Sequence, residues 1–84
     1  MADYLIAYDV SDDQRARKLR ETIERLAATP IQESVWYLRC YEDGPRSLEF
    51  LLGAGLALRE DRLLIAPVSP TTTWTGFNDM SGIL

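Results

Sequence analysis

Histidine is absent from this sequence of 84 residues, and cysteine occurs once, as Cys40. Without histidine the chain cannot build Ser-His or Cys-His nucleophilic sites, a histidine general base or the usual zinc sites. Any metal would therefore be held by oxygen ligands, which favour magnesium, manganese or calcium. A single cysteine allows no internal disulfide, so we expect a reducing compartment and predict a cytoplasmic protein.

Long apolar runs and an excess of positive charge are also missing. No stretch approaches the ~20 apolar residues that span a bilayer, and the N-terminus lacks a signal-peptide pattern, so we expect no membrane contact. Nine basic residues face thirteen acidic ones, and the net charge of −4 opposes nonspecific nucleic-acid binding, although it allows a local basic patch. Hydrophobic residues make up 46% of the chain, which predicts one small folded domain over residues 1–84.

An apolar strand that ends in a carboxylate organises the chain. The sequence YLIAY at residues 4–8 favours a pleated, half-buried surface, and Asp9 follows it at the corner before a helix. Corners on rigid scaffolds often carry chemistry. Asp9 therefore has two interpretations: a catalytic or metal-binding carboxylate, or an ordinary helix-start residue that complements the helix dipole.

The first helix is predicted over residues 12–28. Ser11 and Gln14 have the reciprocal spacing of a capping box, so we expect Ser11 to be the N-cap and Asp12 to lie in the first turn. Apolar residues then recur at three- and four-residue steps, which gives the helix one apolar stripe. Pro30 ends it, because the residue before a proline avoids helical geometry.

The rest of the chain is predicted to form further strands and one more helix. Residues 31–40 are expected to be extended, with a bend near their start, and a second helix is predicted over 46–58. A strand follows over 63–68, and Pro67 places it at a sheet edge because proline cannot donate to a ladder. We also expect a short fifth strand over 71–75.

The order β-α-β-β-α-β predicts an α+β fold, a ferredoxin-like plait with an antiparallel sheet and a short additional C-terminal strand. Both helices then lie on one face of the sheet. The strands over 4–9 and 63–68 are nevertheless apolar on both faces, so the uncovered face needs a partner, most simply a second copy of the chain. Trp36 is predicted to be a core or interface residue, with a base-stacking platform as the alternative.

Two motifs in this sequence resemble a known family. The sequence YDVSDD at 8–13, followed by a basic helix, and IQESVW at 31–36 resemble the second CRISPR-associated adaptation protein (Cas-two), whose members carry Y-D-[IV]-S-D-D and [VI]-Q-x-S-V-[FW]. The sequence TWTGF at 73–77 is more similar to the SinR-like branch of the same superfamily, and the VapD proteins share the plait. The motifs cover the first half of the chain, and the second half is similar by pattern.

The resemblance implies a homodimer in which the strand-end aspartates of two subunits meet and hold a divalent metal, here Mg²⁺. By position it implies Asp9 as the metal ligand and catalytic residue, with Tyr8 supporting it. It also implies that the tail, about residues 69–84, pairs with the other subunit. The nucleic-acid contacts that it implies are Arg15, Arg17, Lys18, Ser34 and Trp36.

Two functions are open at this point. The first is a magnesium-dependent endonuclease linked to CRISPR adaptation, acting on RNA or DNA, with a CRISPR integrase as partner. The second is a non-catalytic dimeric scaffold or SinR-like protein with nucleic-acid-associated or protein partners, which suits the acidic net charge. A continuous basic groove would favour nucleic acid, and its absence would favour protein partners. The residues expected to build such a groove are Arg15, Arg17, Lys18 and Arg39.

Overall fold

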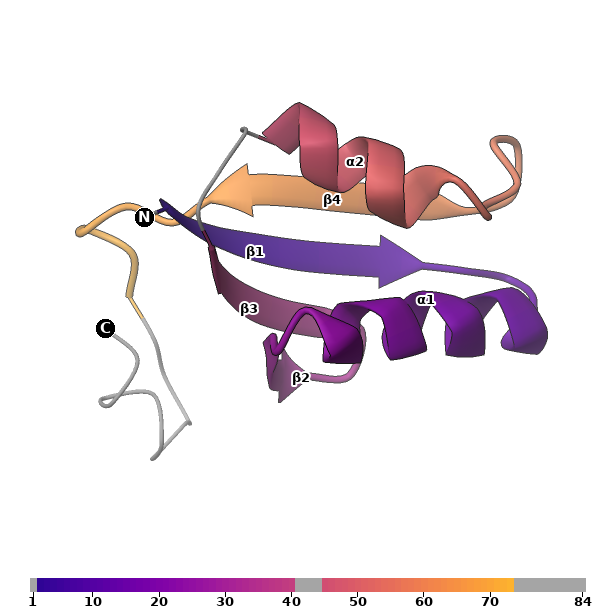
Figure 1. Cartoon of the computed structure of the whole chain (residues 1–84), viewed down its shortest axis with the longest axis horizontal. Helices are drawn as coiled ribbons and strands as arrows, with labels where there is room; N and C mark the ends of the chain where they lie inside the picture. The colour runs from indigo at the N-terminus through magenta and orange to yellow at the C-terminus, as the bar shows by residue number, and fades with distance from the viewer. Residues whose placement is uncertain (1, 41–44, 74–84) are drawn as a thin grey trace.

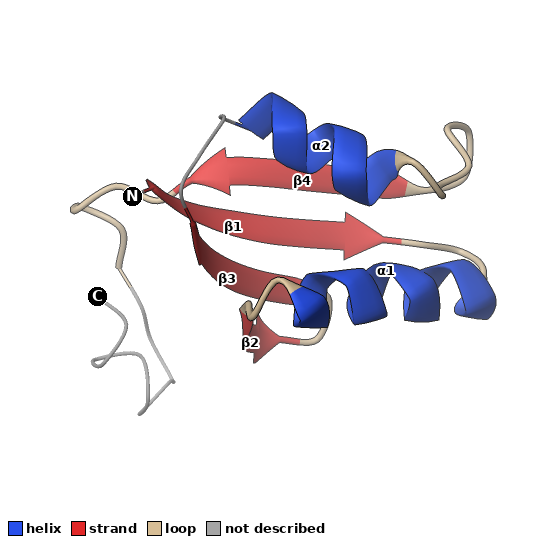
Figure 2. Cartoon of the chain, in the orientation of Figure 1, coloured by secondary structure: helices blue, strands red, loops and turns tan. Residues whose placement is uncertain are grey.

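The computed structural model describes residues 2–40 and 45–73, which form one antiparallel sheet with two helices (Figures 1 and 2). In chain order the elements are β1 (Ala2–Asp9), α1 (Asp13–Arg25), β2 (Thr29–Gln32), β3 (Val35–Cys40), α2 (Pro45–Gly53) and β4 (Arg62–Pro67). The strands lie in the order β2-β3-β1-β4. This arrangement confirms the predicted α+β fold and the ferredoxin-like plait.

Strand β1 is the centre of the sheet, since it pairs antiparallel with β3 on one side and with β4 on the other. Strand β4 lies at an edge, as Pro67 predicts. Successive side chains of β1 alternate between the two faces. Tyr4 and Ile6 are buried beneath the helices, whereas Leu5 packs with a separate cluster on the other face.

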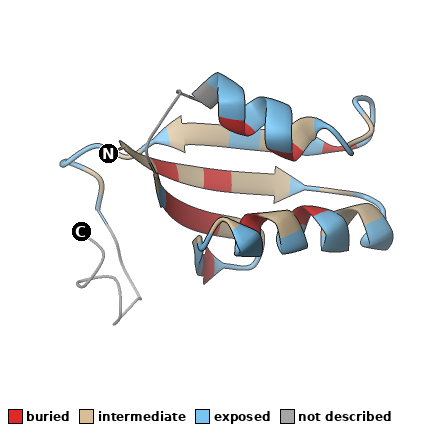
Figure 3. Cartoon of the chain, viewed as in Figure 1, coloured by how far each residue is buried: buried red, intermediate tan, exposed pale blue. Residues whose placement is uncertain are grey.

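The main core lies between the sheet and the two helices, which cover the same face (Figures 1 and 3). The apolar stripe of α1 delivers Leu19 and Ile23, and α2 delivers Leu48 and Leu52. The sheet contributes buried core residues from its two central strands, β1 and β3: Tyr4, Ile6, Trp36 and Leu38. Trp36 is only 7% exposed, which fits the core interpretation of this residue.

Both ends of α1 differ from the prediction. The N-cap is Asp12, not Ser11: Asp12 has extended backbone angles (φ −107°, ψ 128°), and its carboxylate accepts a bond of 2.9 Å from the Arg15 N–H. The helix stops at Arg25, three residues before the predicted end. There Ala27 adopts a left-handed conformation (φ 62°), and its N–H donates to the Glu24 carbonyl, which closes the last turn.

The second helix was predicted too long, and the described part of the predicted fifth strand is not a strand. Helix α2 ends at Gly53, where the Leu56 N–H donates to the Gly53 carbonyl at 3.1 Å and turns the chain away from helical geometry. Residues 71–73 are not in a strand, because residues 69–72 form a turn that the Thr72 N–H closes on the Ser69 carbonyl (3.0 Å). The rest of that predicted strand, and the tail from 74 to 84, lie outside the described residues.

The second face of the sheet carries no helix, and its cover is incomplete. A small cluster centres on Ile31 and Tyr37, with Leu5, Val35 and Val68 packed against it. Leu64 on β4 lies opposite Ala7 in the ladder, which places it on the same face, and it is 62% exposed. Across the described residues, neither helix is long and apolar enough to cross a membrane.

The core predicts which truncations destabilise the fold. Ile23 of α1 is completely buried between the helix and the sheet. Ile23→Ala should therefore lower the free energy of unfolding by about 2–5 kcal/mol, through lost transfer energy and a cavity. Leu58 is 94% exposed, and Leu58→Ala should change it by less than about 0.5 kcal/mol. Urea denaturation at one protein concentration measures both. Equal costs for the two variants would contradict the core assignment.

Candidate functional site

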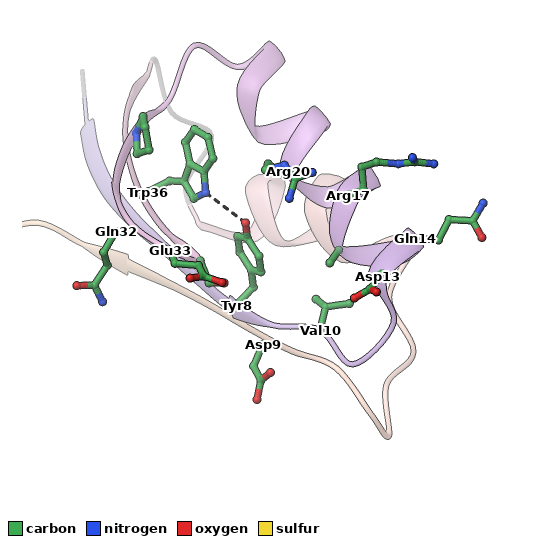
Figure 4. A pocket seen from close by; sticks show the side chains of 13 residues that line it. Tyr8, Asp9, Val10, Asp13, Gln14, Arg17, Arg20, Gln32, Glu33 and Trp36 are labelled. Atoms are coloured by element: carbon green, nitrogen blue, oxygen red, sulfur yellow. Dashed lines mark hydrogen bonds between the residues drawn. The ribbon is translucent and has the colours of Figure 1, made fainter.

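Asp9 ends the central strand on the face that the helices leave uncovered. Its side chain is exposed, and Figure 4 shows its carboxylate directed away from Tyr8 and Trp36. In the β1–β4 ladder Asp9 lies directly opposite Arg62, so the two side chains share that face. In the described part of the chain, neither side chain forms an ion pair. Asp9 is therefore a carboxylate without an ion pair among the described residues, and a cation lies opposite it in the sheet.

The corner after Asp9 is fixed by a second carboxylate, Asp61, that comes from the loop before β4. The Asp61 side chain is 0% exposed and forms an ion pair with Arg15, with 2.8 Å between Nε and Oδ2. It also accepts hydrogen bonds from the backbone N–H groups of Ser11 (3.1 Å) and Ala57 (2.8 Å). These bonds join the β1–α1 corner to the loop that leads into β4.

The same bonds set the electrostatics of Asp61. The Arg15 guanidinium, followed by the Ala57 N–H, holds the pKa of the Asp61 carboxyl far below its usual range. The ion pair with Asp61 likewise raises the pKa of Arg15. Asp61 is therefore ionised wherever the protein is folded near neutral pH, and its charge is neutralised inside the fold.

Five of the residues singled out by the sequence line one groove of about 940 Å³ between α1 and the β2–β3 turn (Figure 4). They are Tyr8, Asp9, Arg17, Ser34 and Trp36. The groove is not a basic one, because its lining combines two arginines with three carboxylates. Those charged residues are Arg17, Arg20, Asp9, Asp13 and Glu33.

Tyr8 and Trp36 form the interior wall of this groove. The Trp36 Nε1–H donates to the Tyr8 hydroxyl at 3.3 Å (Figure 4). Tyr8 packs against the helix-side core, so its side chain lies on the opposite face of β1 from Asp9. Ser34 contributes backbone to the site: it has a left-handed φ of 65°, and its carbonyl accepts a bond of 3.1 Å from the Tyr8 N–H. One chain does not bring the side chains of Tyr8 and Asp9 together.

The cations expected to meet nucleic acid do not form a continuous groove. Arg15 is engaged with Asp61, and Arg39 lies on the uncovered sheet face, where its Nε contacts Asp3 Oδ1 at 2.7 Å. Arg17 and Lys18 are exposed on α1, and neither has an ion pair among the described side chains. Two of the four expected groove residues are therefore held by carboxylates of the same chain.

The Asp3–Arg39 pair marks the other end of the uncovered face. Hydrogen bonding by the Arg39 guanidinium lowers the pKa of Asp3, and the same pair raises the pKa of Arg39. Tyr37 belongs to the apolar cluster and lies next to this pair, and burial raises the pKa of its hydroxyl. The uncovered face is thus apolar at its centre, with an Asp and an Arg opposite one another at each end.

One chain offers little to a metal ion. Within residues 2–40 and 45–73, no group of three or more His, Cys, Asp or Glu side chains lies close enough together to hold one. Asp9 has the oxygen chemistry that magnesium prefers, but it is a single ligand. Asp9 alone therefore does not complete a magnesium site.

The fold agrees with what comparison with known proteins finds. The family model for CRISPR associated protein Cas2 matches residues 1–74, and the chain belongs to this family. Among solved structures, the hypothetical protein TT1823 from Thermus thermophilus is similar, with 29% sequence identity and a TM-score of 0.77. That match covers 90% of this chain and 92% of the other. No curated protein matches the sequence.

Sequence reasoning missed two residues of the site, Asp61 and Arg62. Asp61 looks like any acid in a polar break before a strand, and only the folded chain brings it to Ser11 and Arg15. Arg62 could have been found by pairing the first predicted strand with the last one, since the register places Arg62 opposite Asp9. The register itself was not predicted.

The buried Asp61 leads to a pH prediction. Its folded pKa is depressed, so its stabilisation is fully present above the unfolded pKa of about 4 and is lost as pH falls below that value. Asp61→Asn should lower Tm by roughly 5–10 °C at pH 7, and the difference from wild type should shrink below about pH 4.

Thermal melts of both proteins between pH 2.5 and 7 measure this effect. Glu60→Gln is the matched control, because Glu60 is an exposed and more distant partner of Arg15 at 3.7 Å, and it should leave Tm nearly unchanged. A Tm difference for Asp61→Asn that stays constant down to pH 2.5 would contradict the proposed ionised role.

Proposed function

We propose that this protein acts as a homodimer in CRISPR adaptation, with two copies packed through the uncovered sheet faces. The observation that carries the proposal is the apolar centre of that face, where the side chain of Leu64 is 62% exposed on a strand that belongs to the core sheet. An isologous dimer covers the same patch on both copies. Membership in the Cas2 family supports this arrangement.

In this dimer the Asp9 carboxylates of the two copies approach each other and form a magnesium site. Asp9 suits that role because it is exposed at the rim of the proposed interface and no other side chain in the described residues engages it. Two carboxylates with several waters are a common form of magnesium binding. Neither copy holds the ion alone.

The proposed activity is magnesium-dependent endonuclease cleavage of RNA or DNA. Bound magnesium supplies charge neutralisation at the phosphodiester and makes a nearby water more acidic. The chain itself supplies Asp9 to hold the ion, and Arg17 and Lys18 on α1 to contact the backbone phosphates. Because the chain has no histidine, side-chain acid–base chemistry in the catalytic range falls to carboxylates.

A second candidate function is a non-catalytic dimeric scaffold in the same system. Two observations favour it: Arg62 lies beside the one candidate metal ligand, and Arg15 and Arg39 are engaged in ion pairs instead of forming a basic groove. The partners of such a scaffold would be proteins, of which a CRISPR integrase is the first to test. A cytoplasmic location, expected from the single cysteine, suits both functions.

The dimer can be tested by placing a charge on the uncovered face. Wild type should sediment at twice the 9.5 kDa chain mass at micromolar concentration, and Leu64→Asp should shift it to the monomer because the buried charge has no partner. Phe50→Asp is the control, since Phe50 is exposed on α2, which lies on the helix side of the sheet. Loss of the dimer in the Phe50 variant, with the Leu64 variant still dimeric, would place the interface on the helices instead.

The catalytic role of Asp9 can be tested with Asp9→Asn. Cleavage of single-stranded RNA and duplex DNA should require Mg²⁺, stop with a chelator, and fall at least about 100-fold in the variant, because an amide does not replace a charged ligand. Asp13→Asn, which changes another exposed acid of the same groove, should retain activity. No cleavage by a dimeric wild type would leave the scaffold as the function.

A further inference from the structure

The register of β1 and β4 places Arg62 opposite Asp9, at the rim of the face that we assign to the dimer. The other end of β1 shows what such a pair does in this sheet. Asp3 lies directly opposite Arg39 in the β1–β3 ladder, and there the guanidinium closes on the carboxylate with contacts of 2.7 and 3.2 Å. A cross-strand arginine in this sheet is therefore long enough to reach the aspartate that faces it.

Arg62 is also free to make that contact. Its side chain is exposed and has no ion pair among the residues that the structure describes, and the same holds for Asp9. The neighbouring acids do not compete for it: Asp61 points into the corner and binds Arg15, and Glu60 lies 3.7 Å from the same Arg15. Arg62 is thus a cation that lies directly opposite Asp9 in the ladder and has no other ion-pair partner among the described residues.

In the proposed dimer this pair has a consequence that a single chain does not show. Two Asp9 carboxylates that meet without a cation repel each other, and each would need a counter-charge. Each copy brings its own Arg62, so the four side chains carry no net charge. The guanidinium also uses the same carboxylate oxygens that a magnesium ion would bind.

We propose that Arg62 is a built-in counter-ion of Asp9 that holds the dimer together without metal and that magnesium must displace. Arg62 therefore sets the magnesium concentration at which the Asp9 pair binds the ion. This inference rests on the proposed dimer and names a regulating residue for its site. It concerns metal binding and dimer strength, and it holds whether or not the loaded protein cleaves nucleic acid.

The test uses full-length wild type, Arg62→Gln, Asp9→Asn and the double variant, with MgCl₂ alone as the probe at constant ionic strength. The readout is the MgCl₂ concentration that gives half of the maximal rise in Tm. Removing Arg62 should lower that concentration about tenfold, because the competing cation is gone. Asp9→Asn and the double variant should show no rise. Arg59→Gln removes an exposed arginine from the preceding loop and should match wild type.

Dimer dissociation measured by sedimentation in a chelator gives a second readout. Arg62→Gln should dissociate more readily than wild type, and adding Asp9→Asn to it should restore the dimer, since the uncompensated carboxylates are then removed. A dimeric wild type whose magnesium response and dissociation equal those of Arg62→Gln would overturn the inference and leave the dimer standing. A monomeric wild type would overturn the proposed function, and with it the paired site that the inference requires.

Discussion

The structure depends on one constraint: two helices can cover only one face of a four-stranded sheet whose central strand is apolar on both faces. The covered face holds the fully buried side chains Ile6, Ile23 and Leu38, which form a conventional core. The other face holds a smaller cluster around Tyr37 and leaves Leu64 in water. Burial of such surface is the main favourable term in association, and this exposed apolar surface is the basis of the dimer that we propose.

The position of Asp9 follows from the same constraint. Alternation along β1 sends Tyr8 to the core and Asp9 to the uncovered side, so the two neighbours in sequence serve different surfaces. Asp9 is exposed because it ends the strand on the face that no helix covers. A shift of the ladder by one residue would bury the acid beneath α1 and expose Ile6.

The fold was largely predictable, because it depends on periodicity that is local in the sequence. Two patterns are visible in the sequence itself. One is the apolar stripe that turns Leu19 and Ile23 of α1 toward the sheet, and the other is the alternation that puts Tyr37 and Trp36 on different faces of it. The ends of elements were less predictable. Ser11 and Asp12 are equally good N-cap residues by type. In the structure Ser11 binds Asp61, and Asp12 caps the helix.

The candidate site was predictable only in part. Asp9 was identified from a strand that ends in an acid, but the roles of the arginines depend on contacts between distant segments. Arg15 was predicted to contact phosphate from its place on the helix, and the structure shows it bound to a buried carboxylate 46 residues away. Spacing along one helix cannot show such a partner, because the partner arrives with the last strand of the sheet.

That late arrival concerns the order in which the molecule assembles. Ser11 and Asp61 are separated by 50 residues, so the bond that closes the β1–α1 corner has a high loop-closure cost and forms only when the loop before β4 has docked. Helix α1 and the β2–β3 hairpin can organise earlier through local contacts. A chain that has been synthesised only as far as β3 therefore lacks the carboxylate that fixes the corner after Asp9.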